Sequence, residues 1–242
     1  MKPDLEVVDY NVGEGDYRNV TNYDEKRYVG SANEYKKKVT SNAYNRLIGE
    51  LQGKRILDVG CGTGRGLVDF VGTAKLTVGA DASQDMLLTA ARKVEGRSGV
   101  GLVRSYAQAL PFPTSYFDVV TSLNFLHLFS LQTQKDMIAE MKRVVRPGGV
   151  VVLEFDNAIH GLGLGLLKRW TGRERGSLPR EIRQVIGPGC QVTHVYGAVF
   201  PVVWRVLYRV PSISMHLEKL AYGPPLNWVA HRIFFRLVTA PS

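Results

Sequence analysis

Short apolar runs alternate with segments of helical periodicity through the middle of the chain. The apolar runs are candidates for buried strands and lie at residues 56–59, 76–80, 100–103, 119–122 and 150–155. Helical segments with ordinary start and stop signals follow some of them, at residues 83–96 and 132–145. Strands that alternate with helices form parallel sheets with helices packed on their faces. The pattern therefore predicts an α/β domain with a mostly parallel sheet.

The two ends of the chain follow different patterns. Residues 1–40 are polar and rich in tyrosine, which predicts loop and short helix rather than core. We interpret residues 1–50 as an amino-terminal lid and residues 51–157 as the core of a single domain. Residues 158–242 are apolar and basic. They contain a predicted helix at residues 179–186 and two strand candidates at residues 191–196 and 232–238.

The charge of the chain is unevenly distributed. Lys and Arg number 31 against 22 Asp and Glu, and residues 158–242 hold 11 of these basic residues but only three acidic ones. A surplus confined to one segment indicates a local anionic partner, an anionic group on a substrate or a membrane surface. The hydrophobic content of 45% supplies a packed core and excludes a disordered chain.

Cysteine usage indicates a reducing environment. The chain has two cysteines, Cys61 and Cys190, and no CxxC or Cys/His cluster, so we expect neither a metal site nor a disulfide framework. No apolar run follows the first residues, and the longest uncharged stretch, residues 190–204, contains polar side chains. We therefore expect no signal peptide, no transmembrane helix and a cytoplasmic location.

A glycine-rich loop follows the first predicted strand. Residues 54–66 read KRILDVGCGTGRG, and glycine at such a turn lets the backbone bend sharply and approach a ligand closely. The nicotinamide-binding fingerprint GxGxxG does not fit. Counting from Gly60 places Arg65 at its last position, and counting from Gly62 places Leu67 there.

The remaining pattern is a strand followed by Asp-x-Gly-x-Gly-x-Gly, and it resembles the first motif of class I S-adenosylmethionine-dependent methyltransferases. Three further segments resemble that family in matching order, at residues 78–91, 106–120 and 141–156. The resemblance covers roughly residues 23–156. It implies a Rossmann-like, seven-stranded, mostly parallel sheet with an amino-terminal lid and a helical insertion before the last strand, and S-adenosylmethionine as cofactor.

The resemblance also implies a set of cofactor contacts. Asp58 would lie near the ammonium group, and Asp81, at the end of the second strand, would accept hydrogen bonds from both ribose hydroxyls. Met86 fits either a contact with adenine or core packing. Where the family commonly has an aspartate that binds the adenine amino group, this chain has Tyr106. The expected contacts are Tyr23, Arg27, Asp58, Gly60, Cys61, Gly62, Gly64, Asp81, Ala82, Met86, Ala107, Gln108 and Leu123. Tyr23 and Arg27 would be lid contacts, although a solvated polar arm explains them equally well.

Methyl transfer from a sulfonium is an in-line displacement, so the enzyme mainly positions the acceptor and excludes water. The acceptor is expected beyond the carboxyl ends of the fourth and fifth strands. The expected neighbours are Leu123, Asn124, His127, Asp156 and His160. His127 is the candidate general base. Because it lies in the apolar segment LNFLHLF, a hydrogen-bonded core histidine is the alternative interpretation.

Two substrate classes are disfavoured. After the fourth strand the chain reads TSLNF, which differs from the Asn/Asp-Pro-Pro-Tyr motif used on planar amino groups, and neither cysteine supplies a Pro-Cys nucleophile. Nucleic acid is therefore disfavoured. We expect methylation of a hydroxyl, amine or activated carbon on a hydrophobic small molecule, such as a lipid, quinone or secondary metabolite. The alternatives are a catalytically silent methyltransferase-like partner or membrane-binding protein, and an RNA methyltransferase.

About 35 residues separate the last two strand candidates, more than a hairpin needs. Within this insertion Trp204 and Tyr208, and likewise Arg205 and Arg209, are four residues apart, which on a helix gives adjacent aromatic and basic stripes. The stripes favour a cap over the substrate, with the arginines available to an anionic group. A helix lying on a membrane is the alternative, which would place the cytoplasmic protein peripherally at a membrane.

Overall fold

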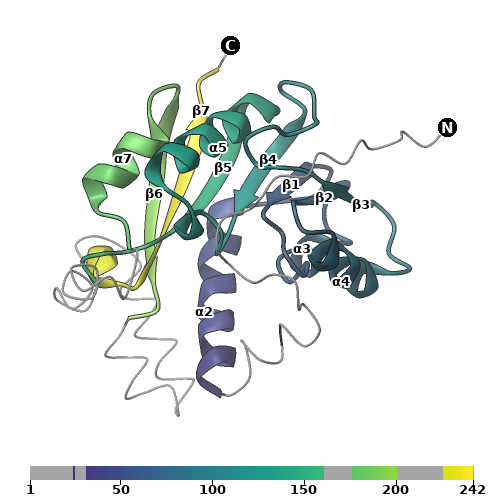
Figure 1. Cartoon of the computed structure of the whole chain (residues 1–242), viewed down its shortest axis with the longest axis horizontal. Coiled ribbons are helices and arrows are strands. Elements are labelled where there is room, and N and C mark those ends of the chain that lie inside the picture. Colours follow the sequence, from purple (N-terminus) through teal and green to yellow (C-terminus); the bar gives the residue numbers. More distant parts are fainter. Residues whose placement is uncertain (1–23, 25–30, 161–175, 201–225, 242) are drawn as a thin grey trace.

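The computed structural model describes residue 24 and residues 31–160, 176–200 and 226–241. Its core is a seven-stranded sheet with the order β3-β2-β1-β4-β5-β7-β6 (Figure 1). The strands are β1 (Arg55–Val59), β2 (Leu76–Asp81), β3 (Val100–Arg104), β4 (Phe117–Ser122), β5 (Val145–Asp156), β6 (Cys190–Ala198) and β7 (Arg232–Thr239). β7 pairs antiparallel with β5 and β6, and the other pairs are parallel. The predicted seven-stranded, mostly parallel sheet is confirmed.

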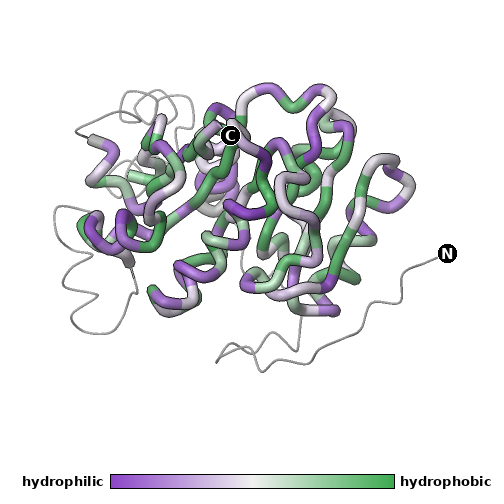
Figure 2. The backbone as a smooth tube through the Cα atoms, turned by 90° about the horizontal axis from the view of Figure 1, so that it is seen from above, coloured by the Kyte–Doolittle hydropathy of each residue, from purple (hydrophilic) through white to green (hydrophobic). Residues whose placement is uncertain are grey.

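Helices cover both faces of the sheet (Figure 1). The helical elements are α2 (Ser31–Ile48), α3 (Leu67–Phe70), α4 (Gln84–Val94), η1 (Leu126–Leu128), α5 (Leu131–Val144), α7 (Pro179–Ile186) and η2 (Leu226–Val229). α2 packs against β5, β6 and β7, while α3 and α4 pack against β2 and β3. α5 and α7 pack together on the opposite face, over β5. In Figure 2 the strands carry long hydrophobic stretches, whereas the helices alternate between hydrophobic and hydrophilic residues.

Local signals explain where the helices begin. The Ser83 hydroxyl accepts a hydrogen bond from the Met86 amide at 3.3 Å and caps α4, and Ser130 caps α5 in the same way. α7 starts with Pro179, and the Glu181 carboxylate accepts from the Leu178 amide at 2.7 Å. Each of these helices therefore begins at a capping residue or a proline that the sequence shows directly.

Helix α2 corrects the prediction for the amino-terminal segment. Residues 31–40 were expected as loop and short helix outside the core, and this is wrong, because they begin an 18-residue helix that forms part of the core. Tyr35, Val39, Ala43 and Leu47 are spaced four residues apart and are buried. The lysines at positions 36–38 lie between them and lower the average hydropathy, so that the buried stripe is obscured in the sequence.

The sheet order places a switch point between β1 and β4. β1 pairs with β2 on one side and with β4 on the other, so the loops that follow these strands diverge at one edge of the sheet. In open α/β sheets ligands bind at this edge. The antiparallel β7 begins there, since Asp156 at the carboxyl end of β5 is paired with Arg232 at the start of β7.

Within the described residues, no helix combines the length and apolar character needed to cross a bilayer. The predicted helical insertion with Trp204, Arg205, Tyr208 and Arg209 falls in residues 201–225, outside the described residues. The prediction of a cap or a membrane-surface helix therefore stays a prediction.

Candidate functional site

The glycine loop after β1 is fixed against the end of β2. The amides of Gly60 and Cys61 both donate to the Ala80 carbonyl, at 2.8 and 3.1 Å, and the Gly64 amide donates to the Cys61 carbonyl at 2.9 Å. Gly60, Gly62 and Gly64 have φ values of 74°, 52° and 75°, in the left-handed region that glycine adopts without a Cβ penalty. The alternating glycines are thus required by the path of the backbone.

Close neighbours give two of these glycines a second role. A Cβ atom on Gly60 would lie 2.3 Å from the Phe125 ring, and one on Gly64 would lie 2.8 Å from the Ala90 Cβ. Phe125 follows β4, so its ring joins the loop after β4 to the loop after β1. No pattern in the sequence indicates this contact, because it depends on β1 and β4 being neighbours in the sheet.

Asp81 ends β2 and faces the glycine loop. Its two carboxylate oxygens accept hydrogen bonds from the Gly62 amide at 2.8 Å and the Ser83 amide at 2.9 Å. Burial raises the pKa of Asp81, while these hydrogen bonds from the backbone lower it. A carboxylate oxygen has more than one lone pair, so Asp81 can accept further hydrogen bonds from a ligand hydroxyl beside the loop.

Asp58, near the end of β1, is only 4% exposed. The Thr121 hydroxyl on β4 donates to its carboxylate at 2.7 Å. The pKa of Asp58 is raised to about 7, mainly by burial and to a lesser extent by the charge of Asp81, although the hydrogen bond from Thr121 lowers it. Two carboxylates therefore face one loop, and the site is electrostatically suited to a positively charged ligand.

Among the other predicted cofactor residues, Met86 lies beside the same loop. Met86 is buried, with its sulfur 4.0 Å from the position of a Cβ on Gly62. Ala107 is buried and Gln108 is exposed in the turn after β3, and Leu123 packs on the α2 side of the sheet. The Ala82 carbonyl accepts from the Arg104 side chain at 3.0 Å. Tyr23 and Arg27 lie outside the described residues.

Cys61 lies within the loop as an inert thiol. It is buried and unpaired with another cysteine, and burial together with Asp58 and Asp81 raises the pKa of its thiol well above the usual value. A thiol that stays protonated is a poor nucleophile. Cys61 therefore contributes packing, beside Leu67 and Leu87, and no covalent chemistry.

Asp24 contacts both the glycine loop and helix α4. Its carboxylate accepts from the Thr63 hydroxyl at 2.9 and 3.1 Å and pairs with Lys93 on α4. Thr63 lies between two loop glycines, so these contacts connect three segments of the site. The sequence analysis missed this link, because nothing in the pattern around Asp24 distinguishes it from other acidic residues in the segment.

We expect Thr63→Val to lower the free energy of unfolding by about 1 kcal/mol, because the variant keeps the shape of the side chain but removes the donor to Asp24. The amides of the glycine loop should exchange faster with solvent. Chemical denaturation and hydrogen exchange measure the two effects. Thr73→Val, at an exposed position, is the matched control and should change neither. Equal stability of Thr63→Val and the native chain would contradict the link.

A second polar group lies at the same edge of the sheet, on β5 and β7. Glu154 is 2% exposed, accepts from the Asn124 amide at 3.0 Å and pairs with Arg232. Asn124 follows β4 and has a φ of 54°, so Glu154 holds the loop after β4 in an unusual conformation. The carboxylate thus joins the ends of β4, β5 and β7.

Lys36 extends this group from helix α2. Burial lowers the pKa of Lys36, the charge of Arg232 lowers it further, and the charge of Asp156 raises it. Two cations and two carboxylates, those of Glu154 and Asp156, therefore lie together at the carboxyl end of β5. Only Asp156 among them was predicted from the sequence as a neighbour of the acceptor.

The two predicted histidines lie at this edge as well. His127 is partly exposed on η1, directly after β4. His160 follows β5, is 5% exposed and packs against His231, with the ring centroids 4.7 Å apart. His231 precedes β7 and was not singled out from the sequence. The reversed direction of β7 could have indicated it, because a residue before an antiparallel strand lies beside the residues that follow its partner.

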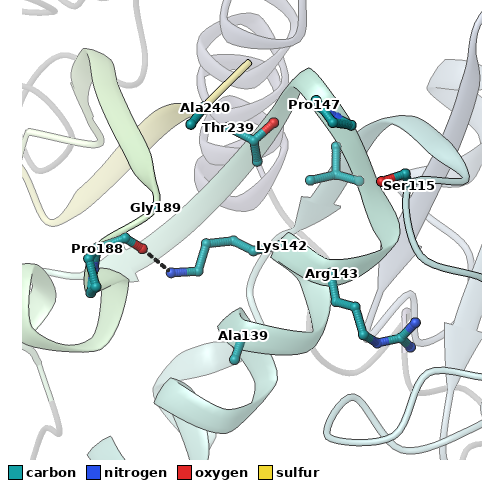
Figure 3. A pocket seen from close by; sticks show the side chains of 10 residues that line it. Ser115, Ala139, Lys142, Arg143, Pro147, Pro188, Gly189, Thr239 and Ala240 are labelled. Carbon is teal, nitrogen blue, oxygen red and sulfur yellow. Dashed lines mark hydrogen bonds between the residues drawn. The ribbon is translucent and has the colours of Figure 1, made fainter. Parts of the chain in front are cut away.

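A hollow of about 340 Å³ lies elsewhere, at the opposite edge of the sheet (Figure 3). It is lined by Ser115 before β4, Pro147 in the first part of β5 and Thr239 at the end of β7. Lys142 in its wall donates to the carbonyls of Ile186 and Pro188, so its charge supports the end of α7. The hollow is therefore separate from the glycine loop and its carboxylates.

Comparison with known proteins agrees with this geometry. Residues 56–149 match the family model described as a methyltransferase domain. A demethylmenaquinone methyltransferase of Bacillus licheniformis is 37% identical over 134 residues, which cover 54% of this chain and 56% of that protein. A ubiquinone/menaquinone biosynthesis C-methyltransferase of Stutzerimonas stutzeri is 39% identical over 123 residues, covering 48% and 47%. The chain thus matches about half the length of these relatives.

Solved structures share the fold over most of the chain. The magnesium protoporphyrin IX methyltransferase of Synechocystis PCC 6803, solved with bound S-adenosylhomocysteine, has a TM-score of 0.66 and 17% identity, covering 93% of this chain and 97% of that one. An S-adenosylmethionine-dependent methyltransferase of Thermotoga maritima has a TM-score of 0.65 and 18% identity, covering 92% and 97%. At these identities the similarity shows the arrangement of helices and strands.

Proposed function

We propose that this chain transfers a methyl group from S-adenosylmethionine to a carbon atom of a hydrophobic quinol, because residues 56–149 match a methyltransferase domain and the chain shares its fold with a methyltransferase solved with S-adenosylhomocysteine. The observation that carries the proposal is the pair of carboxylates, Asp58 and Asp81, beside a loop whose glycines have positive φ values. The relatives named as quinone methyltransferases supply the substrate class.

The residues of the site fit this cofactor. S-adenosylmethionine carries an ammonium and a sulfonium charge, and it supplies the methyl group that is transferred. Asp58 is held by Thr121 in a buried position where its ionised form lacks compensation, as its raised pKa shows. An ammonium group near Asp58 would supply that compensation, and Asp81 would accept from the ribose hydroxyls. The site thus matches the ligand in charge and in hydrogen-bonding capacity.

The raised pKa of Asp58 predicts a pH dependence of cofactor binding. Because binding of a cation favours the ionised carboxylate, affinity should rise by about tenfold per pH unit between roughly pH 5 and 7 and level off above pH 7. In Asp58→Asn the affinity should be lower and nearly independent of pH in this range. Calorimetric titration with S-adenosylhomocysteine, which keeps the ammonium group, measures both. An unchanged slope in Asp58→Asn would contradict the assignment.

The raised pKa of Asp58 also determines how the free energy of unfolding of the ligand-free protein changes with pH. The folded-state pKa of about 7 lies above the ordinary aspartate value, so Asp58 contributes stability that is fully present below about pH 4. This contribution is lost as the pH rises to about 7. Denaturation at several pH values should show the loss in the native chain and a smaller one in Asp58→Asn.

The acceptor chemistry favours the reduced form of the ring. A quinone carbon is electron-poor, whereas a ring carbon beside a quinol hydroxyl is electron-rich and can attack a methyl group. Loss of the hydroxyl proton leaves a negatively charged oxygen, which agrees with the expected anionic character of the substrate. The hydroxyl and amine acceptors considered from the sequence remain distinguishable, because the three products carry the new methyl group on different atoms.

The test is a turnover assay with the full chain, S-adenosylmethionine and 2-prenyl-1,4-naphthoquinol under anaerobic, reducing conditions. The expected products are S-adenosylhomocysteine and a naphthoquinol with one additional methyl group on carbon, identified by mass spectrometry and NMR. Quinol without cofactor, and the oxidised quinone with cofactor, are the controls. Binding of the cofactor without methylation of any quinol would overturn the substrate class.

We further propose that the protein meets its substrate at a membrane surface. The expected cytoplasmic protein would meet a hydrophobic quinol at a membrane surface, and the basic residues of the segment 158–242 suit anionic lipid. Co-sedimentation with vesicles that contain phosphatidylglycerol, compared with neutral vesicles and repeated at high salt, tests this contact. Equal binding to both vesicle types would argue against an electrostatic contribution.

A further inference from the structure

We propose that His231 is the residue that accepts the proton of the quinol hydroxyl, with His160 as its positioning residue, in the role that the sequence pattern suggests for His127. The inference rests on the proposed function, since it names the base of the same site. It is carried by the position of His231 at the carboxyl edge of the sheet, where the acceptor is expected.

The backbone of His231 is fixed on both sides. Its amide donates to the Val199 carbonyl at 3.0 Å, and its carbonyl accepts from the Asn157 amide at 2.8 Å. His231 thus lies between the end of β5 and the residue that follows β6. A base on such a rigid support keeps its position relative to a bound substrate.

Asn157 holds the surrounding chain in place. Its side-chain nitrogen donates to the carbonyls of Trp228 and Ala230, at 2.7 and 2.8 Å, and its side-chain oxygen accepts from the Ile159 amide at 2.9 Å. Asn157 is 1% exposed, so these hydrogen bonds are shielded from water. They fix the turn before His231 to the turn before His160 and so bring the two rings together.

The two histidines differ in exposure. His160 is buried, while His231 is partly exposed, and the ring planes meet at 62° with the centroids 4.7 Å apart. The more exposed ring is the one that a substrate can contact. The buried ring limits the orientations of its neighbour, which is the function of a positioning residue.

A continuous series of contacts joins His231 to the cofactor loop. Arg232, the next residue, pairs with Glu154, which accepts from the Asn124 amide. The residue after Asn124 is Phe125, whose ring lies against Gly60. Among the described residues, the charged groups at this end of the sheet include Glu154 and Asp156 on β5, Arg232 on β7 and Lys36 on α2.

The proposed step balances in atoms and charge. The neutral imidazole of His231 takes the proton of the quinol hydroxyl, and the electrons of that bond move into the ring. The neighbouring ring carbon forms a bond to the methyl group as the methyl–sulfur bond breaks and its electron pair goes to sulfur. The ring carbon then transfers its own proton to the oxygen, which restores the hydroxyl. One proton remains on the imidazole and passes to solvent.

His231→Gln should lower kcat by about 100-fold at saturating cofactor, within the range for loss of a general base, and leave the affinity for S-adenosylhomocysteine unchanged. His160→Gln should lower kcat by about tenfold. The acid limb of the kcat profile, which a histidine base produces, should disappear in His231→Gln. Saturating cofactor separates this limb from the titration of Asp58.

Two further variants serve for comparison. The kcat of His127→Gln and of the matched control His194→Gln, on the edge strand β6, should stay within about threefold of that of the native chain.

Two further measurements separate chemistry from folding. Imidazole added to His231→Ala should raise the kcat of this variant at least about tenfold. A structural defect would prevent this rescue. Independently of turnover, the NMR signals of ¹³C-labelled histidine rings report on substrate contact. With S-adenosylhomocysteine bound, 2-prenyl-1,4-naphthoquinol should shift the His231 signal in a saturable way. This measurement uses the native chain and decides the case if the variants fail to fold.

The outcomes distinguish this inference from the proposed function. Quinol methylation by the native chain with nearly full activity in His231→Gln, or with an unshifted His231 signal, overturns the inference alone. A 100-fold loss in His127→Gln instead would return the role to His127. Absence of quinol methylation by the native chain overturns the proposed function and this inference with it.

Discussion

Asp81→Ala is expected to weaken binding of S-adenosylhomocysteine by at least about 100-fold. Two hydrogen bonds from ribose hydroxyls to a carboxylate contribute about 1.5 to 3 kcal/mol each, and about 1.4 kcal/mol corresponds to a tenfold change in Kd. Asp81 also accepts from the amides of Gly62 and Ser83, so the variant loosens the glycine loop at the same time. Isothermal titration calorimetry of the full chain measures the change.

Two comparisons make this prediction specific. Asp81→Asn keeps one acceptor oxygen and should bind with intermediate affinity. Asp85→Ala removes an exposed carboxylate one turn further along, in the first turn of α4, and should bind like the native chain. Melting temperatures show whether each variant is folded. Native affinity in folded Asp81→Ala would mean that the carboxylate does not contact the ribose, and the position of the cofactor would need to be reassigned.

The half of the sheet around the cofactor loop could be predicted from the sequence because its signals are local. The strand, the glycines and Asp58 occur within a few residues of one another, and the end of β2 repeats the pattern with Asp81. Backbone turns with positive φ favour glycine, and so the turns of this loop are visible in a single sequence. The seven-stranded, mostly parallel sheet followed from the same resemblance, whereas the order of its strands comes from the structure.

Helix α2 could not be predicted in the same way. Its buried stripe contains one tyrosine and one alanine, and three consecutive lysines separate the first two members of the stripe. Burial of this stripe depends on the sheet face that receives it, made of residues such as Val150, Val152 and Phe234. Local hydropathy therefore indicates a solvated arm, whereas tertiary packing produces a core helix.

The polar group at the end of β5 was missed because it depends on the reversed strand. Glu154, Arg232 and His231 are far apart in the sequence, and only the antiparallel pairing of β5 with β7 brings them together. Asp156 and His160 were found because Asp156 ends β5 and His160 lies four residues further along the chain. The residues on the acceptor side of the site are thus brought together by the pairing of distant strands, whereas those on the cofactor side lie close together in a sequence motif.

Arg232→Met is expected to lower the free energy of unfolding by about 3 kcal/mol, because it leaves the buried carboxylate of Glu154 without its ion-pair partner. For a chain of this size that change corresponds to about 6 to 12 °C in Tm. Arg146→Met is the matched control. It breaks an ion pair with Asp118 in which the arginine side chain is 46% exposed, and exposed pairs contribute at most about 1 kcal/mol.

The double variant Glu154→Gln/Arg232→Met separates the cost of an isolated charge from the loss of packing. Glutamine keeps an oxygen that can accept from the Asn124 amide and carries no charge, so the double variant should recover at least half of the stability lost in Arg232→Met. Thermal and chemical denaturation of the four proteins in this cycle give the coupling energy. A coupling energy near zero would show that the pair contributes nothing specific, and that the loops after β4 and before β7 are held by packing alone.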